Sequence, residues 1–204
     1  MDLSNELLAA SRCVKTLWPW RFGLYVTTNL QTSLGRLNSF PAAEAEIELL
    51  KCCGSNKWAR RMVAERPFTN LAELVEQADK IWWSLEPPDW LEAFHSHPKI
   101  GEKKAAAATS DQSKRWSEAE QAAVTIAASE TLEALADLNR KYEEQFGYIF
   151  IVCATGKSSE EMLAILRQRL GNNSDEELRN AAAEQAKITQ LRLKKLIDSS
   201  SITL

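Results

Sequence analysis

Histidine is scarce in this sequence, whose 204 residues contain two, His95 and His97, both within the stretch AFHSHPKIGE. Basic charge is not in excess either, because the net charge is −3, and this argues against a nucleic-acid partner. The four cysteines form no C-x-x-C pair of the kind that holds structural zinc. The longest apolar-looking run near the N-terminus, TLWPWRFGLYVTTNL, is interrupted by Pro19 and Arg21, so no membrane span is expected.

The chain has no recognisable targeting signal. Asp2 and Glu6 are acidic at positions where a signal or transit peptide would be basic, and the ending SITL differs from the peroxisomal S-K-L signal. Cys52 and Cys53 are adjacent, which is poor geometry for a mutual disulfide. We therefore expect a reducing compartment, and the sequence leaves peroxisomal and cytoplasmic locations open.

Helical periodicity begins at Pro41 and continues almost to the end of the chain. The pattern predicts an all-α protein, a compact helical bundle of about six to seven helices. Helices are expected over 41–53, 56–67, 69–85, 89–97, 117–146, 158–170 and 174–197. Residues 1–40 lack a sustained period, so the chain is divided into an N-terminal extension over 1–40, one domain over 41–197 and a short tail over 198–204.

At two places in this helical pattern, individual residues decide the expected secondary structure. Pro87–Pro88 are expected to end the helix over 69–85, and Asp89 is expected to be the N-cap of the next helix. The run YIFIVCA, residues 148–154, is short and continuously apolar. Local propensity alone predicts a strand there.

Three S-x-x-E patterns are typical of capping boxes that open helices. They are Ser117–Glu120, Ser158–Glu161 and Ser174–Glu177. The first belongs to the stretch SEAEQ, whose Glu120 and Gln121 have a second interpretation, in which they face a pocket beside His97. These residues alone leave both interpretations open.

The H-x-H pair is one candidate for a metal site. Such pairs bind metals on strands, where residues two apart share a face, but this stretch is expected to end a helix. A metal also needs a third and usually a fourth ligand, and the sequence contains no other histidine. We therefore expect no bound metal.

Pro98 distinguishes His97 from His95. Because a residue before proline is disfavoured in the helical conformation, the helix is expected to end near His95–Ser96 and to present His97 in a turn completed by Gly101. A histidine held there can transfer protons near neutral pH without a cofactor. The alternative, a surface histidine stabilised by the helix C-terminus, is left open by these residues alone.

The segment KITQLRL, residues 187–193, is basic. Arg192 and Lys195 are three residues apart and lie on one side of a helix, as on an ordinary solvated face. If this side is turned inward, Arg192 can bind a substrate carboxylate through two hydrogen bonds.

Four segments, in their order along the chain, resemble the 2-oxo-4-hydroxy-4-carboxy-5-ureidoimidazoline (OHCU) decarboxylase family. They are DWLEAFHSHPKIGE, SEAEQ, LNRKYEEQFGYIFIVCATGKSSEEMLAILRQRL and ELRNAAAEQAKITQLRL. The resemblance covers residues 41–197. Within the family, the sequence is similar to plant and algal forms, in which this domain is often fused to a transthyretin-like 5-hydroxyisourate hydrolase. No such hydrolase domain is expected in this chain.

The resemblance implies a cofactor-free carboxy-lyase that forms (S)-allantoin from OHCU in urate catabolism. It implies catalytic roles for His97, Glu120 and Arg192. It implies substrate contacts from Pro98, Ser117, Gln121, Phe150, Ile151, Val152, Cys153 and Ala154, the last five through the backbone of a segment that is not a strand. A homodimer and functional coupling to a 5-hydroxyisourate hydrolase are implied as well.

Two other functions compete with this one. A non-enzymatic helical interaction module would bind a partner through residues 1–40, which contain Trp18 and Trp20. A metal-dependent hydrolase would use the H-x-H pair, but the missing ligands argue against it.

Overall fold

The computed structural model describes residues 33–98 and 129–199. A helix over 33–39 is followed by α2 (Ala42–Cys53), α3 (Asn56–Ala64), α4 (Leu71–Trp83), α5 (Pro87–His95), α7 (Ser129–Phe146), α8 (Ser159–Arg169) and α9 (Ser174–Ser199). These two ranges contain no β-strand. The prediction of an all-α protein is therefore confirmed. Within these ranges, none of the helices combines the length and the hydropathy of a membrane span.

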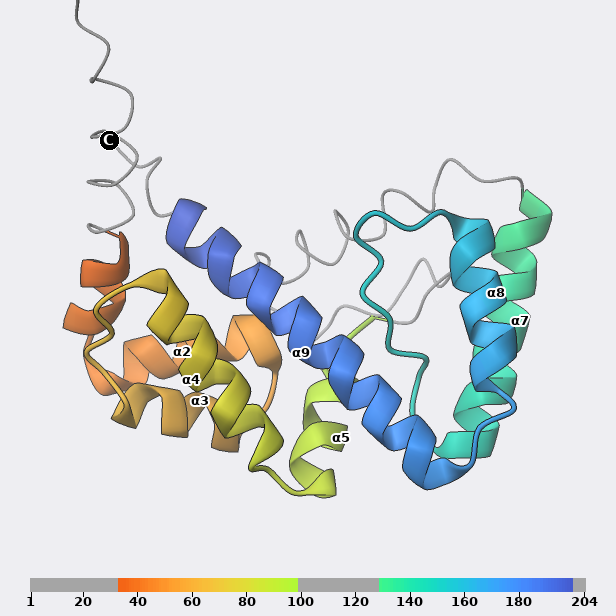
Figure 1. The fold of residues 1–204 in the computed structure, drawn as a ribbon, viewed down its shortest axis with the longest axis horizontal. Helices are drawn as coiled ribbons and strands as arrows, with labels where there is room; N and C mark the ends of the chain where they lie inside the picture. Colours follow the sequence, from red (N-terminus) through yellow and green to blue (C-terminus); the bar gives the residue numbers. More distant parts are fainter. Residues whose placement is uncertain (1–32, 99–128, 200–204) are drawn as a thin grey trace, which may run out of the picture.

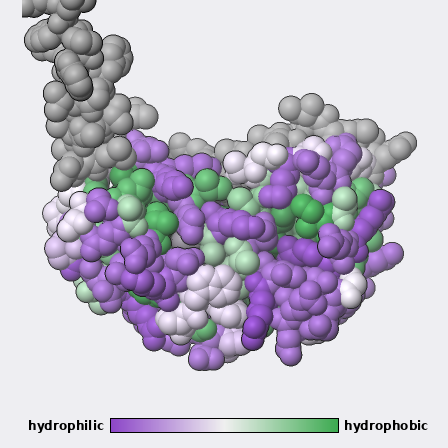
Figure 2. Space-filling view, viewed as in Figure 1, coloured by the Kyte–Doolittle hydropathy of each residue, from purple (hydrophilic) through white to green (hydrophobic). Residues whose placement is uncertain are grey.

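The last helix, α9, connects two groups of helices (Figure 1). On one side α9 packs against α2, α4 and α5, and α3 packs against α2 and α4. At the other end α7 and α8 pack against each other as a pair. Hydrophilic residues cover most of the face shown in Figure 2, and the fully buried side chains, such as Trp58 and Trp82, lie inside.

Several helix ends follow the local signals in the sequence. Gly54 ends α2 in the left-handed conformation, with φ 86°, as a glycine after a helix commonly does. The Ser55 side chain then caps α3 by accepting a hydrogen bond from Trp58 N–H. Ser158 and Glu161 form the predicted capping box at the start of α8.

The turn between α4 and α5 differs from the prediction. The helix α4 ends at Trp83, before the two prolines, and α5 begins at Pro87. Glu86 is the N-cap residue, and Asp89, predicted to be the N-cap, is instead the third helical residue, whose side chain accepts a hydrogen bond from Glu86 N–H. Proline suits the first helical position because its missing N–H would have no partner there. Pro87 therefore starts the helix instead of preceding it.

Residues 33–40 pack against the connection between α3 and α4. Leu34 and Leu37 are buried, and the Arg66 guanidinium donates hydrogen bonds to the carbonyl oxygens of Leu37 and Phe40. The other residues of the predicted extension, 1–32, lie outside the described part of the chain.

The apolar run over 148–154 is buried throughout, yet it forms neither a helix nor a strand. The strand that local propensity predicts is therefore wrong, and the family resemblance gave the better expectation. A buried segment without secondary structure needs other partners for its N–H and C=O groups. Side chains of the neighbouring helices supply several of these partners.

Candidate active site

His97 lies in the turn directly after α5. The helix ends at His95, as the following proline predicts, and His97 N–H donates a hydrogen bond to the Phe94 carbonyl at 3.2 Å. The end of α5 packs closely on the end of α2, because a Cβ built on Gly54 would lie 2.2 Å from Ser96 Oγ. The absence of a side chain at Gly54 thus allows the turn that carries His97 to approach the C-terminus of α2.

The imidazole of His97 is hydrogen-bonded to α9. Its Nε2 lies 2.7 Å from Oε1 of Gln185, which is fully buried. Burial, and to a smaller extent the positive charge of Arg192, lower the pKa of His97 from 6.5 to about 3, although the hydrogen bond to Gln185 opposes the shift. His97 is therefore a neutral imidazole at pH 7, which is the form that accepts a proton.

His95 differs from His97 in its surroundings. Its ring is exposed, and its Nδ1 lies 2.6 Å from the carbonyl oxygen of Leu91, one turn earlier in α5. Within residues 33–98 and 129–199, no group of three or more histidine, cysteine, aspartate or glutamate side chains is placed to hold a metal ion. The described residues therefore give the H-x-H pair no further ligands.

Arg192 is turned inward, as the second interpretation of the KITQLRL segment required. It lies on α9, its side chain is buried, and its charge acts on His97, Cys52 and Cys53. Burial raises the pKa of the Cys53 thiol to about 12 and raises that of Cys52 as well. Both thiols are therefore protonated at neutral pH and are poor candidates for nucleophiles.

The segment over 150–154 is fixed through its backbone. Four side chains from α7, α8, α9 and the following turn bind it. Two of these side chains accept hydrogen bonds from backbone N–H groups: Asn139 Oδ1 from Phe150 at 2.9 Å, and Glu184 Oε2 from Cys153 at 2.7 Å. The other two donate to backbone carbonyl oxygens: Arg169 Nη1 to Ile151 at 2.8 Å, and Lys157 Nζ to Cys153 at 2.6 Å. Both backbone groups of Val152 have no hydrogen-bond partner among the described residues. The path of this segment is therefore determined by side chains of three helices and one turn.

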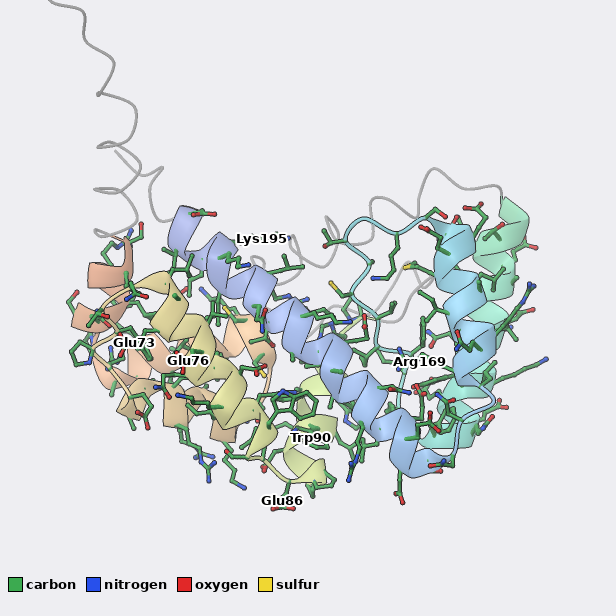
Figure 3. The ribbon with its side chains drawn as sticks, in the orientation of Figure 1. Glu73, Glu76, Glu86, Trp90, Arg169 and Lys195 are labelled. Atoms are coloured by element: carbon green, nitrogen blue, oxygen red, sulfur yellow. The ribbon has the colours of Figure 1, made fainter. Side chains whose placement is uncertain are left out.

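Arg169 belongs to a buried polar cluster behind this segment. Its guanidinium pairs with Glu177, and the Tyr142 hydroxyl donates to the same carboxylate. Burial raises the pKa of Tyr142 above its usual value, so this hydroxyl stays protonated. Figure 3 shows Arg169 between α9 and the segment. Sequence reasoning assigned Glu177 to a capping box, and it missed Arg169.

The capping box predicted over Ser174–Glu177 is wrong. Asn173 Oδ1 accepts a hydrogen bond from Glu176 N–H at the start of α9, and Glu177 is fully buried. The side chain of Glu177 faces Arg169 and does not return to the helix end. The physical reason is that a buried arginine requires a counter-charge, and Glu177 is the carboxylate within reach.

Consecutive residues of α9 hold the two parts of the predicted site. Glu184 binds the backbone of Cys153, and Gln185 binds the ring of His97. Sequence reasoning did not single out Gln185. The available signal was its spacing: Gln185, Thr189 and Arg192 are four and three residues apart, and therefore share one face of α9.

Three predicted site residues, Ser117, Glu120 and Gln121, lie outside the described residues. The structure brings His97 and Arg192 together at the junction of α2, α5 and α9. The roles predicted for Pro98 and for the substrate-binding set stay predictions.

Two hollows lie away from His97. One of about 700 Å³ is lined by residues at the starts of α5 and α9, including Glu86 and Trp90, which are labelled in Figure 3. Another, of about 430 Å³, is lined by Val152, Arg169 and Glu184, and so lies beside the 150–154 segment. His97 and Arg192 line neither of them.

Comparison with known proteins decides the family. The model of the OHCU decarboxylase family matches residues 38–194. The chain belongs to the OHCU decarboxylase family. It is 38% identical over 157 residues to the "Uric acid degradation bifunctional protein TTL" of Arabidopsis thaliana, which covers 76% of this chain and 48% of that protein. The chain therefore spans about half the length of that relative.

Other relatives are matched over more of their length. The 2-oxo-4-hydroxy-4-carboxy-5-ureidoimidazoline decarboxylase of Amia calva is 32% identical over 134 residues, which make up 65% of this chain and 75% of that protein. A crystal structure of an OHCU decarboxylase in the presence of (S)-allantoin superposes with a TM-score of 0.64 at 37% identity, covering 74% of this chain and 97% of that one. The fold of this OHCU decarboxylase family member is therefore the fold of that enzyme.

Proposed function

We propose that this protein decarboxylates OHCU to (S)-allantoin, as a step of urate degradation, and that His97 transfers the proton. The observation that carries the proposal is the neutral, partly buried His97 beside the buried cation of Arg192, in a chain of the OHCU decarboxylase family. The relative from Amia calva is named for this reaction, and the solved OHCU decarboxylase was crystallised with (S)-allantoin, which supports the choice of substrate and product.

The chemistry of OHCU explains why a proton carrier and a cation suffice. The ring carbon C4 bears a carboxylate and a hydroxyl, and it adjoins the imine carbon C5, which bears the ureido group. When CO₂ leaves, the electron pair of the broken bond forms C4=C5, and the imine nitrogen takes up a proton from solvent, which is the one proton that the overall reaction consumes. The hydroxyl then loses its proton as C4 becomes a carbonyl, and C5 gains a proton on one face, which gives (S)-allantoin. The C=N group accepts the electrons, so the reaction needs no cofactor.

Each residue has a part in this scheme. Neutral His97 accepts the hydroxyl proton and returns a proton to C5. Arg192 binds the carboxylate, and the backbone over 150–154 positions the ring and ureido groups. Glu120 orients His97 or binds the hydroxyl or ureido N–H, and Ser117 and Gln121 contact the substrate; these three roles rest on the family resemblance.

The experiment generates OHCU freshly with urate oxidase and 5-hydroxyisourate hydrolase and follows allantoin chirality by circular dichroism. The protein should form (S)-allantoin well above the spontaneous rate, and His97→Asn should lower kcat by roughly 10²- to 10⁴-fold. His95→Asn, with its exposed ring, is the matched control and should keep the wild-type rate. A wild-type rate in His97→Asn overturns the role of His97, and no excess of (S)-allantoin with the unaltered protein overturns the reaction.

We further propose, on the family resemblance alone, that the protein is a homodimer and acts together with a 5-hydroxyisourate hydrolase. Light scattering after size-exclusion chromatography should give twice the chain mass of 22.9 kDa. A mass of one chain contradicts the dimer. Whether the protein is peroxisomal or cytoplasmic stays a prediction for microscopy of the tagged protein.

A further inference from the structure

Gln185 makes three polar contacts inside the protein. Its Oε1 lies 2.7 Å from His97 Nε2, and its Nε2 lies 3.2 Å from Thr189 Oγ1 and 3.4 Å from the carbonyl oxygen of Cys53. The side chain is fully buried, so water does not compete for these contacts. All the polar atoms of this amide are therefore assigned to protein partners.

The Cys53 carbonyl determines which way the amide faces. A carbonyl oxygen can only accept hydrogen bonds, so the NH₂ group of Gln185 must be the end that faces Cys53. The amide oxygen then faces His97, and it too can only accept. The hydrogen bond between the two side chains consequently requires a proton on His97 Nε2.

A neutral imidazole carries one N–H, so a proton on Nε2 leaves the lone pair on Nδ1. No described residue is hydrogen-bonded to the Nδ1 atom of His97. We propose that Gln185 is a positioning residue that fixes His97 as the Nε2–H tautomer and so makes Nδ1 the atom that accepts and returns the proton. The tautomer rests on geometry alone, whereas the role of Nδ1 also rests on the proposed decarboxylation.

His95 provides an internal reference with the opposite assignment. Its Nδ1 faces the carbonyl oxygen of Leu91 at 2.6 Å. By the same argument, the proton of a neutral His95 must lie on Nδ1. The two histidines of this chain should therefore be opposite tautomers, although only one residue separates them.

Gln185 is supported from two sides. Thr189 lies one turn later on α9, and Cys53 ends α2, so the amide is fixed between the two helices. Arg192 continues the same face of α9, and among the described residues its charge is the one that acts on His97. One helix face thus supplies both the hydrogen bond that orients the ring and the cation beside it.

The first experiment observes the tautomers directly. Protein labelled with ¹⁵N-histidine is examined by long-range ¹H–¹⁵N correlation NMR at a pH where both rings are neutral, and His95→Gln assigns the signals. One ring should give the Nε2–H pattern and belong to His97, and the other should give the Nδ1–H pattern. An Nδ1–H pattern at His97, or an average of the two tautomers, overturns the proposal.

The second experiment tests whether the tautomer matters for turnover. Gln185→Leu removes the acceptor, so His97 should populate both tautomers, and kcat should fall by roughly 10²-fold with a much smaller change in KM. Gln190→Leu is the matched control: it makes the same substitution on the same helix, but Gln190 lies beside Ala78 and Trp82. It should leave kcat and the His97 spectrum unchanged.

A conservative variant separates positioning from a merely structural effect. Gln185→Glu keeps an oxygen that accepts from His97 Nε2–H, so it should retain the Nε2–H spectrum and raise the pH at which His97 titrates, because a carboxylate stabilises the imidazolium. A higher kcat in Gln185→Glu than in Gln185→Leu supports the positioning role of Gln185. An equal loss of kcat in both variants, with native circular dichroism spectra, overturns that role. If Gln185→Leu does not fold, the wild-type spectrum still decides the tautomer.

The two proposals fail in different ways. A protein that shows the Nε2–H tautomer at His97 but forms no excess of (S)-allantoin overturns the proposed function and keeps the tautomer assignment. An active protein with Nδ1–H at His97 keeps the function and overturns the role of Gln185.

Discussion

Arg169 and Glu177 form an ion pair inside the protein: Arg169 Nε lies 2.7 Å from Glu177 Oε1, and the two side chains are 8% and 0% exposed. The same guanidinium donates to the carbonyl oxygen of Ile151. The pair therefore joins α8 and α9 to the segment over 148–154. Because this segment has no helix or sheet of its own, its path through the protein depends on such side-chain contacts.

Removal of the Glu177 charge should strongly destabilise the protein. Glu177→Gln leaves the Arg169 guanidinium buried without a counter-charge, and breaking a buried pair in this way costs about 3–5 kcal/mol. Urea denaturation at pH 7 measures the free energy of unfolding. Glu76→Gln is the control, because Glu76 pairs with Lys80 at 64% and 60% exposure and should lose less than about 1 kcal/mol. Equal losses in the two variants contradict the importance of the buried pair.

A second prediction concerns the other side of the same segment. Asn139 is buried, and its Oδ1 accepts from Phe150 N–H. Asn139→Leu leaves that N–H without a partner, which should lower the free energy of unfolding by about 1–3 kcal/mol and reduce OHCU turnover as the segment shifts. Gln190→Leu, at a half-buried position on α9 beside Ala78 and Trp82, is the comparison and should keep both properties. Unchanged turnover in Asn139→Leu would show that this hydrogen bond does not position the site.

Local signals predicted the fold well where they act alone. Gly54 ends α2 and Ser158 opens α8, because a left-handed glycine and a capping side chain need only their own helix. The same S-x-x-E spacing failed at Ser174–Glu177. There the Glu177 carboxylate pairs with Arg169 of another helix, and a contact between two helices cannot be predicted from a four-residue pattern.

The same difference between local and long-range signals applies to the candidate site. Pro98 correctly placed His97 just beyond the helix end, since the preference of a pre-proline residue is local. The partner of His97, Gln185, is 88 residues away in the sequence, so no local rule connects them. Arg192 was equally consistent with a solvated face, and only the packing of α9 against α2 and α5 shows that it is buried.

Titration of His97 should make the stability depend on pH. The pKa of His97 is about 3 in the folded protein and 6.5 without the fold, so between these values the unfolded chain binds more protons. The contribution of His97 to the free energy of unfolding is therefore complete above pH 6.5 and is lost as the pH falls toward 3. Between pH 7 and pH 5, wild-type protein should lose more stability in urea denaturation than His97→Gln. His95→Gln retains His97, so its loss should also exceed that of His97→Gln, and identical losses in all three proteins contradict the shift.

Gly54 should not tolerate a side chain, because two independent costs act there. Its φ of 86° lies in the left-handed region, where alanine costs about 1–2 kcal/mol, and a Cβ would lie 2.2 Å from Ser96 Oγ. Gly54→Ala should therefore lower the free energy of unfolding by at least that amount and, by displacing the end of α5, weaken the hydrogen bond of His97 to Gln185. Gly35→Ala makes the same substitution within the helix over 33–39, with nothing within 4 Å of the new Cβ, and should raise stability by up to about 1 kcal/mol. Urea denaturation should therefore show a lower free energy of unfolding for Gly54→Ala and a higher one for Gly35→Ala. An unchanged free energy of unfolding in Gly54→Ala would contradict this account of the turn that carries His97.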